Sequence, residues 1–157
     1  MAEAMHTLKL KIPPPLVAVI MAALMWLVAR AVPKLSFAFP ARHWLAAVAA
    51  LAGVSTAVAG VTAFGRAGTT LNPLRPDKAS TLVVSGVYNL TRNPMYLGLL
   101  FLLVAWALLL SNLLAIVFVP AFIAYMNHFQ IAPEEAALTT AFGDEFRQYK
   151  SRVRRWI

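Results

Sequence analysis

The sequence predicts an all-α, polytopic membrane protein with about four transmembrane helices. Hydrophobic residues make up 61% of its 157 residues and charged residues only 13%. A soluble domain of this length needs more polar surface to stay in solution. The apolar residues also gather in four long runs with almost no charge inside them. We therefore expect a single membrane domain that covers residues 1–157.

The four apolar runs are the candidate membrane spans, and their limits are Leu16–Val32, Trp44–Phe64, Pro94–Leu110 and Leu113–Phe129. A helix needs about 20 apolar residues to cross the hydrocarbon core, with about 17 as a lower bound. All but the second run are short by that measure. Only Ser111 and Asn112 separate the last two runs. This spacing predicts a C-terminal helical hairpin over residues 94–129, with a tight tip that barely reaches the far side of the membrane.

The Lys and Arg residues divide unevenly between the two sides of the predicted membrane. Eleven fall on the side that holds both termini, and three, Arg30, Lys34 and Arg42, fall on the other side. The positive-inside rule then places both termini in the cytoplasm, and we expect a prokaryotic inner membrane. The net charge of +8 fits this topology and contact with anionic lipid headgroups, rather than nucleic acid binding.

The segments outside the hairpin have separate expected roles. Residues 1–64 hold two spans, and in the second of them Ala49, Gly53 and Ala57 recur every four positions, which predicts a close helix-packing face. Residues 65–93 are expected to form an ordered cytoplasmic loop, because aromatic, apolar and turn residues occur along them. The chain has no cysteine, which excludes disulfide bonds and thiolate metal sites. We expect no metal.

The tail, residues 130–157, is expected to form two short cytoplasmic helices that complete a cofactor pocket. Pro133 suits the first position of one helix and Gly143 its C-terminal cap, after which Asp144 can start the second. Apolar and aromatic residues of the second helix fall on one stripe opposite basic residues, and they are Phe142, Phe146, Tyr149, Val153 and Trp156. This pattern is typical of a basic amphipathic helix on a membrane surface.

The start of the third span is a candidate ligand site. Asn93 is a good N-cap and Pro94 a good first residue, so a well-started helix explains both without any ligand. The free N–H groups and the positive dipole end of the same helix also suit an anion. Arg92 adds positive charge there, and Gly98 would give a ligand room. Glu134 or its neighbour Glu135 could compensate a helix dipole or serve as a counter-charge for a cationic ligand.

Two motifs of this sequence resemble those of isoprenylcysteine carboxyl methyltransferases and related phospholipid methyltransferases. The first is Leu82-Val83-Val84-Ser85-Gly86-Val87-Tyr88, followed by Arg92-Asn93-Pro94-Met95-Tyr96-Leu97-Gly98. The second, in the tail, comprises Glu134-Glu135, Leu138, Phe142-Gly143, Phe146, Tyr149 and Val153. The two motifs occur in the family's order on either side of a helical hairpin. The resemblance covers roughly residues 70–157 and does not extend to the first two spans.

The resemblance implies that the protein uses S-adenosylmethionine to methylate an acceptor. By motif, the residues expected to bind this cofactor are Thr81, Leu82, Val83, Tyr88, Asn93, Pro94, Met95, Tyr96 and Glu134. Gln130 and Arg92 are expected on the substrate side. Because Gln130 stands about where prenylcysteine enzymes offer an Arg to the substrate carboxylate, we expect a lipophilic small molecule or a lipid as acceptor. No catalytic base is assigned, since a carboxylate or thiolate acceptor needs none.

Three alternatives remain open at this point. A membrane reductase of the sterol-reductase type has a similar C-terminal architecture and uses NADPH, but such enzymes are longer and this chain lacks room for a sterol-sized cavity. A four-helix membrane glutathione transferase would need a different pattern of Arg and Asn on its second helix, and the second span here has no charge. A non-enzymatic membrane scaffold would bind no cofactor at all.

Overall fold

The computed structural model describes residues 12–67 and 81–157, and the named elements in these ranges are all helical. They are the α-helices α2 (Pro14–Ala31), α3 (Arg42–Ala67), α4 (Pro94–Leu110), α5 (Leu113–Ile116), α6 (Phe118–Tyr125) and α7 (Ala132–Arg152), the 3₁₀ turns η1 (Pro33–Leu35) and η3 (Gly86–Asn89), and the π-helical turn η4 (Met126–Ile131). This confirms the predicted all-α fold.

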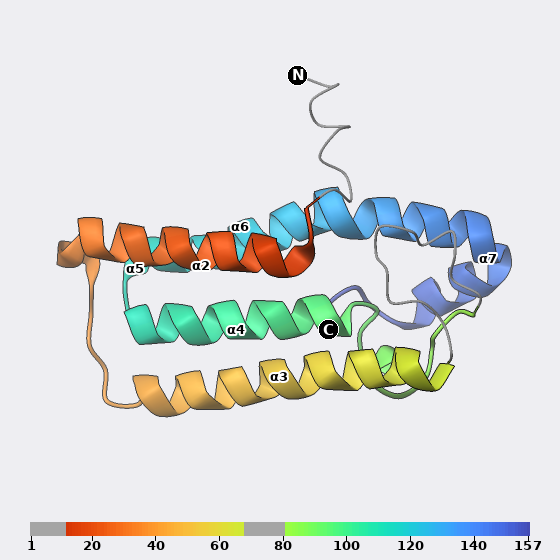
Figure 1. Cartoon of the computed structure of the whole chain (residues 1–157), viewed down its shortest axis with the longest axis horizontal. Helices are drawn as coiled ribbons and strands as arrows, with labels where there is room; N and C mark the ends of the chain where they lie inside the picture. The colour runs from red at the N-terminus through yellow and green to blue at the C-terminus, as the bar shows by residue number, and fades with distance from the viewer. Residues whose placement is uncertain (1–11, 68–80) are drawn as a thin grey trace, which may run out of the picture.

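The long helices lie side by side, with α4 between α2 and α3 (Figure 1). Three helical stretches, Pro14–Ala31, Arg42–Ala67 and Leu113–Arg152, are long and apolar enough to cross a membrane. Helix α4 is also apolar but has 17 residues, about the lower bound for a span. The protein is therefore an integral, polytopic membrane protein. Its central helix, α4, is the shortest of the long helices.

The tight hairpin predicted between α4 and α5 is present, and Asn112 organises it. Ser111 takes a left-handed conformation with φ 47°. The fully buried Asn112 side chain accepts hydrogen bonds from the N–H groups of Leu114 and Ala115 and donates one to the carbonyl oxygen of Val32. Buried polar groups need hydrogen-bond partners within the protein, and Asn112 supplies them to both the hairpin tip and the end of α2.

The helix of the fourth predicted span does not end at Phe129. Elements α5, α6, η4 and α7 follow one another as a helical run from Leu113 to Arg152. The π turn η4 lies just before Pro133, which has no N–H to give to an ordinary helical hydrogen bond. A wider turn at that point lets the chain continue helically past the proline. About 20 residues suffice to cross the membrane, so we expect the span to end near the predicted Phe129 and the part of α7 from Glu134 onward to lie beyond it.

Helix α7 breaks at Gly143, as the sequence predicted. Gly143 has φ 53° and ψ −121°, a backbone conformation that is open to glycine and strained for other residues. Beyond the break the chain folds back toward the start of α4 (Figure 1). The break therefore brings the end of the chain back to the end of the bundle where α4 begins.

The apolar stripe beyond Gly143 does not face a membrane surface, and that expectation is wrong. Phe146, Tyr149 and Val153 are buried, and they pack against Val83 and Tyr88 of the loop that precedes α4. An apolar stripe seeks any apolar partner, and here the loop provides one within the protein. The basic side chains on the opposite face stay exposed.

Gly98 serves helix packing rather than room for a ligand, which corrects its expected role. A Cβ atom added at Gly98 would lie 2.7 Å from the carbonyl oxygen of Gly53 and 2.8 Å from the Cβ of Ala57, both on α3. A Cβ at Gly53 would lie 2.8 Å from the Gly98 carbonyl oxygen. The small residues predicted as a packing face on the second span thus do bring α3 close to α4.

We expect Gly98→Ala to lower the stability of the protein by roughly 1–2 kcal/mol, because the new methyl group meets backbone atoms that cannot move aside locally. Gly65→Ala is the matched control, since a Cβ there meets nothing within 4 Å. Thermal unfolding in detergent should show a lower midpoint for Gly98→Ala only. Equal midpoints for the two variants would contradict the packing described for α3 and α4.

Candidate functional site

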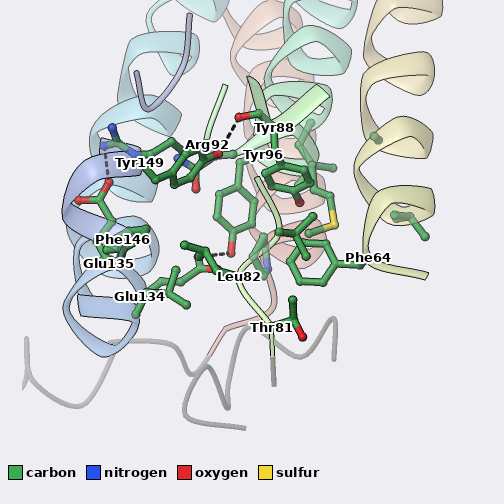
Figure 2. A pocket seen from close by; sticks show the side chains of 18 of the residues that line it. Phe64, Thr81, Leu82, Tyr88, Arg92, Tyr96, Glu134, Glu135, Phe146 and Tyr149 are labelled. Carbon is green, nitrogen blue, oxygen red and sulfur yellow. Dashed lines mark hydrogen bonds and ion pairs between the residues drawn. The ribbon is translucent and has the colours of Figure 1, made fainter. Parts of the chain in front are cut away.

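A cavity of about 380 Å³ lies at the end of the bundle where α4 begins (Figure 2). Helices α2, α3, α4 and α7 and the loop before α4 all contribute to its wall. Its volume is in the usual range for small-molecule and cofactor sites, about 300–1,000 Å³. Eight of the nine residues expected to bind a cofactor line it, and they are Thr81, Leu82, Val83, Tyr88, Asn93, Met95, Tyr96 and Glu134.

The remaining predicted residues lie in three different situations. Pro94 does not line the cavity but is the buried first residue of α4. Gln130 does not line it either; it is fully buried and its amide donates a 2.8 Å hydrogen bond to the carbonyl oxygen of Ile12. Arg92 does line the cavity, although its guanidinium is engaged by the acidic residue Glu135. The structure thus brings Arg92, but not Gln130, to the predicted site.

Glu134 is the carboxylate most available to a ligand. It accepts a 3.1 Å hydrogen bond from the buried Tyr96 hydroxyl, and among the described residues no cation forms an ion pair with it. Burial raises the pKa of Glu134 from the ordinary 4.5 to about 7; the Tyr96 hydrogen bond lowers it, and the negative charge of Glu135 raises it further. An unpaired carboxylate with a pKa near neutrality favours the arrival of a cationic group.

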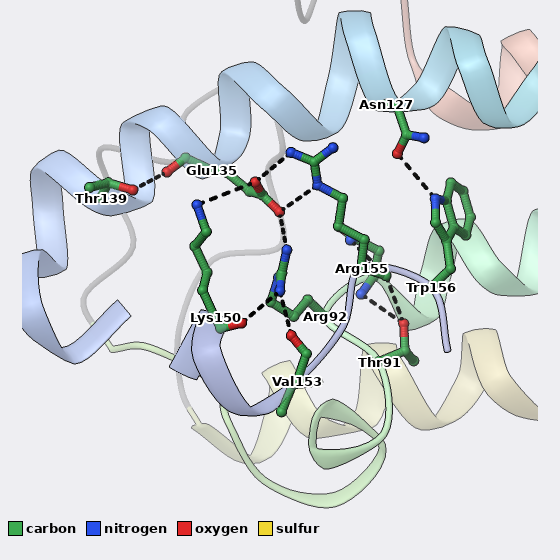
Figure 3. A network of polar contacts seen from close by, with 10 residues as sticks. Thr91, Arg92, Asn127, Glu135, Thr139, Lys150, Val153, Arg155 and Trp156 are labelled. Carbon is green, nitrogen blue, oxygen red and sulfur yellow. Dashed lines mark hydrogen bonds and ion pairs between the residues drawn. The ribbon is translucent and has the colours of Figure 1, made fainter. Parts of the chain in front are cut away.

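Glu135, the next residue, is fully engaged by cations (Figure 3). Its carboxylate lies 2.6 Å from Arg92, 2.8 Å from Arg155 and 3.7 Å from Lys150. Burial by itself would raise the pKa of Glu135, but the hydrogen bonds from Arg155 and Arg92 outweigh it and lower the pKa. Sequence reasoning did not find this cluster. Its members are far apart along the chain, and no motif spacing connects them.

Residues 153–157, here called the 153–157 strap, cross the start of α4. The backbone N–H of Arg92 donates to the carbonyl oxygen of Arg154 at 2.9 Å, and the Thr91 hydroxyl donates to that of Arg155 at 3.0 Å. The Asn93 amide also donates to the Arg155 carbonyl, at 3.0 Å. Asn93 occupies the N-cap position of α4, but its side chain does not cap the helix, which corrects the expected role. Its amide holds the strap instead.

Aromatic contacts fix the loop that roofs the cavity. The Tyr149 hydroxyl donates a 2.7 Å hydrogen bond to the carbonyl oxygen of Tyr88, and the Tyr88 ring meets that of Phe64 edge-on at 5.5 Å. Burial raises the pKa of Tyr88 well above its usual range and that of Tyr149 to about 12, so both stay neutral. These contacts join the loop to α3 on one side and to α7 on the other.

The cavity changes character along its length. Near α7 it offers Glu134, Asn93 and the Tyr96 hydroxyl, whereas Ala57 and Leu99, farther along α3 and α4, give it an apolar wall. Such a site suits a ligand with one charged end and an apolar or flat body. Among residues 12–67 and 81–157, no group of three or more His, Asp or Glu side chains could hold a metal ion.

Residues 41–145 of the chain match the phospholipid methyltransferase family. The chain belongs to this family. The match runs from the start of α3 through the loop and the hairpin into α7, and so contains most of the cavity wall. It confirms the family that the two sequence motifs indicated and makes this protein a membrane methyltransferase.

One relative is a short protein of Haemophilus influenzae (strain ATCC 51907 / DSM 11121 / KW20 / Rd), described only as an uncharacterized protein. It is 56% identical over 63 residues, which are 40% of this chain and 100% of the relative. Its description says nothing about an acceptor. No solved structure matches this family member.

Proposed function

We propose that the protein moves a methyl group from S-adenosylmethionine to a lipophilic or lipid-borne acceptor. One observation carries the proposal: eight residues chosen by motif surround one cavity, and among them is Glu134, whose carboxylate has no ion pair within residues 12–67 and 81–157. Membership in a methyltransferase family supports the reaction class. It also favours a methyl donor over the NADPH of the reductase alternative.

The residues present fit S-adenosylmethionine, which supplies an electrophilic methyl group when bound. Glu134 would meet its cationic end. No side chain among the described residues caps the first N–H groups of α4, and these suit the carboxylate of the methionine part. Leu82, Val83 and Tyr88 offer apolar and aromatic surface to the rest of the molecule. The proposed binding residues are thus the nine predicted from sequence, with Pro94 acting by starting α4.

The chain itself would hold the two reactants in line and keep water away from them, rather than transfer a proton. Holding two reactants in line can lower a barrier by roughly 7–11 kcal/mol in favourable cases. The loop around Tyr88, held by Tyr149 and packed on Phe146, closes one side of the cavity against water. We assign no catalytic base.

The acceptor would approach along the apolar wall of the cavity. Pro14 of α2, Ala57 and Val61 of α3 and Leu99 of α4 line this side, so an apolar tail would find apolar partners there. Arg92 has one buried donor, its Nε–H, that finds no acceptor among the described residues, and this supports its expected role near an anionic group. Gln130 does not line the cavity, so its identity no longer supports a lipid acceptor. The support now comes from the apolar residues of the cavity wall.

Calorimetry on detergent-purified protein tests the proposed cofactor. We expect S-adenosylmethionine and S-adenosylhomocysteine to bind and NADPH not to bind. Tight NADPH binding without S-adenosylhomocysteine binding would support the reductase alternative. A protein that binds none of the three would match the non-enzymatic scaffold.

We also propose that both termini face the cytoplasm of a prokaryotic cell, from the distribution of Lys and Arg. The natural chain has no cysteine, so single cysteines report topology cleanly. Lys34→Cys, at an exposed site between α2 and α3, should react with a membrane-impermeant maleimide on intact cells. Ser151→Cys, at an exposed site near the end of α7, should react only after lysis. Labelling of both on intact cells would contradict this orientation.

A further inference from the structure

Two adjacent glutamates have different surroundings in this protein. In the part of the chain that the structure describes, Glu134 lines the cavity, bonds to Tyr96 and pairs with no cation, whereas Glu135 is 7% exposed and pairs with three cations. Its two strongest partners come from segments that are far apart in the sequence. Arg92 lies just before α4, and Arg155 lies in the 153–157 strap.

Arg92 extends the link from Glu135 to the backbone of the returning chain. Its Nη1 donates to the carbonyl oxygens of Val153 and, at 3.3 Å, Lys150. Arg155 grips both oxygens of Glu135, with Nε–Oε1 at 3.0 Å and Nη2–Oε2 at 2.8 Å. Such a two-pronged pair fixes geometry as well as charge. One carboxylate thereby ties α7, the start of α4 and the strap together (Figure 3).

We propose that Glu135 is a positioning residue for the cofactor site, which holds the 153–157 strap over the start of α4 by pairing Arg92 with Arg155. The inference rests on the proposed function. Its consequence is local: the strap gives Asn93 its acceptor, the Arg155 carbonyl oxygen. Asn93 and Tyr96 then keep fixed positions on the cavity wall.

Loss of the Glu135 charge would leave Arg92 and Arg155 facing each other with no carboxylate between them. Removing one partner of a buried ion pair is costly because the other charge stays buried and uncompensated. The chain would relieve this by releasing Arg155 and with it the strap, since Arg155 is 38% exposed and Arg92 only 10%. The start of α4 would lose the hydrogen bonds that hold Thr91 and Asn93.

The first test compares S-adenosylhomocysteine affinity of the wild type, Glu135→Gln and Asp144→Asn by calorimetry. Asp144 is a matched control, because its ion pair with Arg147 is exposed (85% and 60%) and apart from the site. We expect Glu135→Gln to bind at least about tenfold more weakly and Asp144→Asn to bind like the wild type. Wild-type affinity in Glu135→Gln would overturn the inference while the proposed function stood. Failure of the wild type to bind would count against the proposed function instead.

The second test separates positioning from a general loss of folded protein. The groups that face Glu134 are Tyr96 from α4, Tyr88 from the loop and Glu135 beside it on α7, and the charge of Glu135 raises the pKa of Glu134. The midpoint of the pH dependence of S-adenosylhomocysteine binding should therefore move to lower pH in Glu135→Gln. Misfolding would reduce the number of binding sites without moving that midpoint, so fewer sites with an unmoved midpoint would overturn the inference.

A third test uses Arg155→Gln, a milder variant whose result does not depend on how well Glu135→Gln folds. Together with Glu135→Gln it forms a double-mutant cycle. If Arg155 acts through Glu135, Arg155→Gln should weaken S-adenosylhomocysteine binding by itself, and the double variant should bind no more weakly than Glu135→Gln. Arg147→Gln, in the exposed pair, is the control for loss of an arginine. Wild-type affinity in Arg155→Gln, or fully additive losses in the double variant, would show that the two residues do not form one clamp.

Discussion

Glu134→Gln is expected to weaken S-adenosylhomocysteine binding about a hundredfold, or about 2.8 kcal/mol. Glutamine keeps the shape of the side chain and can still bond to the Tyr96 hydroxyl, but it loses the charge that would meet an ammonium group. Calorimetry in detergent measures the difference. Glu145→Gln is the control, because Glu145 is exposed and does not line the cavity. Affinity within twofold of the wild type in Glu134→Gln would mean that this carboxylate does not bind the ligand.

The raised pKa of Glu134 gives binding and stability opposite pH dependences. A cationic ligand needs the ionised carboxylate, so affinity should fall as pH drops below about 7, by up to about tenfold per pH unit. Between pH 4.5 and about 7, Glu134 is protonated in the folded protein without ligand but ionised in the unfolded chain. The resulting stability is present below pH 4.5 and is lost as pH rises through about 7. Glu134→Gln should remove both effects, and their persistence in that variant would assign them to another group.

Phe146→Ala is expected to lower stability by about 3–5 kcal/mol, the usual cost of deleting a buried phenylalanine ring. Phe146 is 2% exposed and packs with Tyr149 and Val153 of its own segment and with Val83 and Tyr88 of the loop. Its loss would loosen the roof of the cavity, so ligand binding should fall with it. Thermal unfolding in detergent measures the first effect and calorimetry the second.

Phe37→Ala provides the control for Phe146→Ala. Phe37 is 39% exposed, stacks only on Phe39 among the described aromatic residues, and lies beside the hairpin tip at the opposite end of the bundle. The Phe37→Ala variant should lose much less stability than Phe146→Ala and keep full ligand binding. Equal losses in the two variants would contradict the role given to the contact between the loop and the end of α7.

Local signals were enough to predict the helices and about half of the residues that line the cavity. Apolar runs predicted the spans. The limits of α4, Pro94–Leu110, are those predicted for the third span, because Pro94 starts the helix and Ser111 ends it. The tip at Asn112 followed from spacing alone. Eight of the residues proposed to bind the cofactor meet in the cavity because they lie on the loop, the start of α4 and the start of α7, which the hairpin brings to one end.

Features that depend on which segments pack against each other could not be predicted from the sequence. An apolar stripe such as that of Phe146 shows that a face is buried, but not whether lipid or the loop covers it. Gly98 permits close approach, and only the fold shows that α3, rather than a ligand, makes that approach. The pairing of Glu135 with Arg155 spans 20 residues and a sharp turn, so the sequence gives no sign of it. The π turn before Pro133 likewise depends on packing that no periodicity records.

The most direct test of the central claim is transfer of radiolabel from S-adenosylmethionine to an acceptor. Purified protein is incubated with the labelled donor and either a total lipid extract of the expression host or a farnesylcysteine analogue. We expect label in the lipid fraction, strongly reduced with Glu134→Gln, and little on the farnesylcysteine carboxylate. Efficient labelling of farnesylcysteine would contradict the proposed acceptor. Absence of label from every acceptor, with wild-type protein that also fails to bind S-adenosylhomocysteine, would contradict the proposed methyl transfer itself.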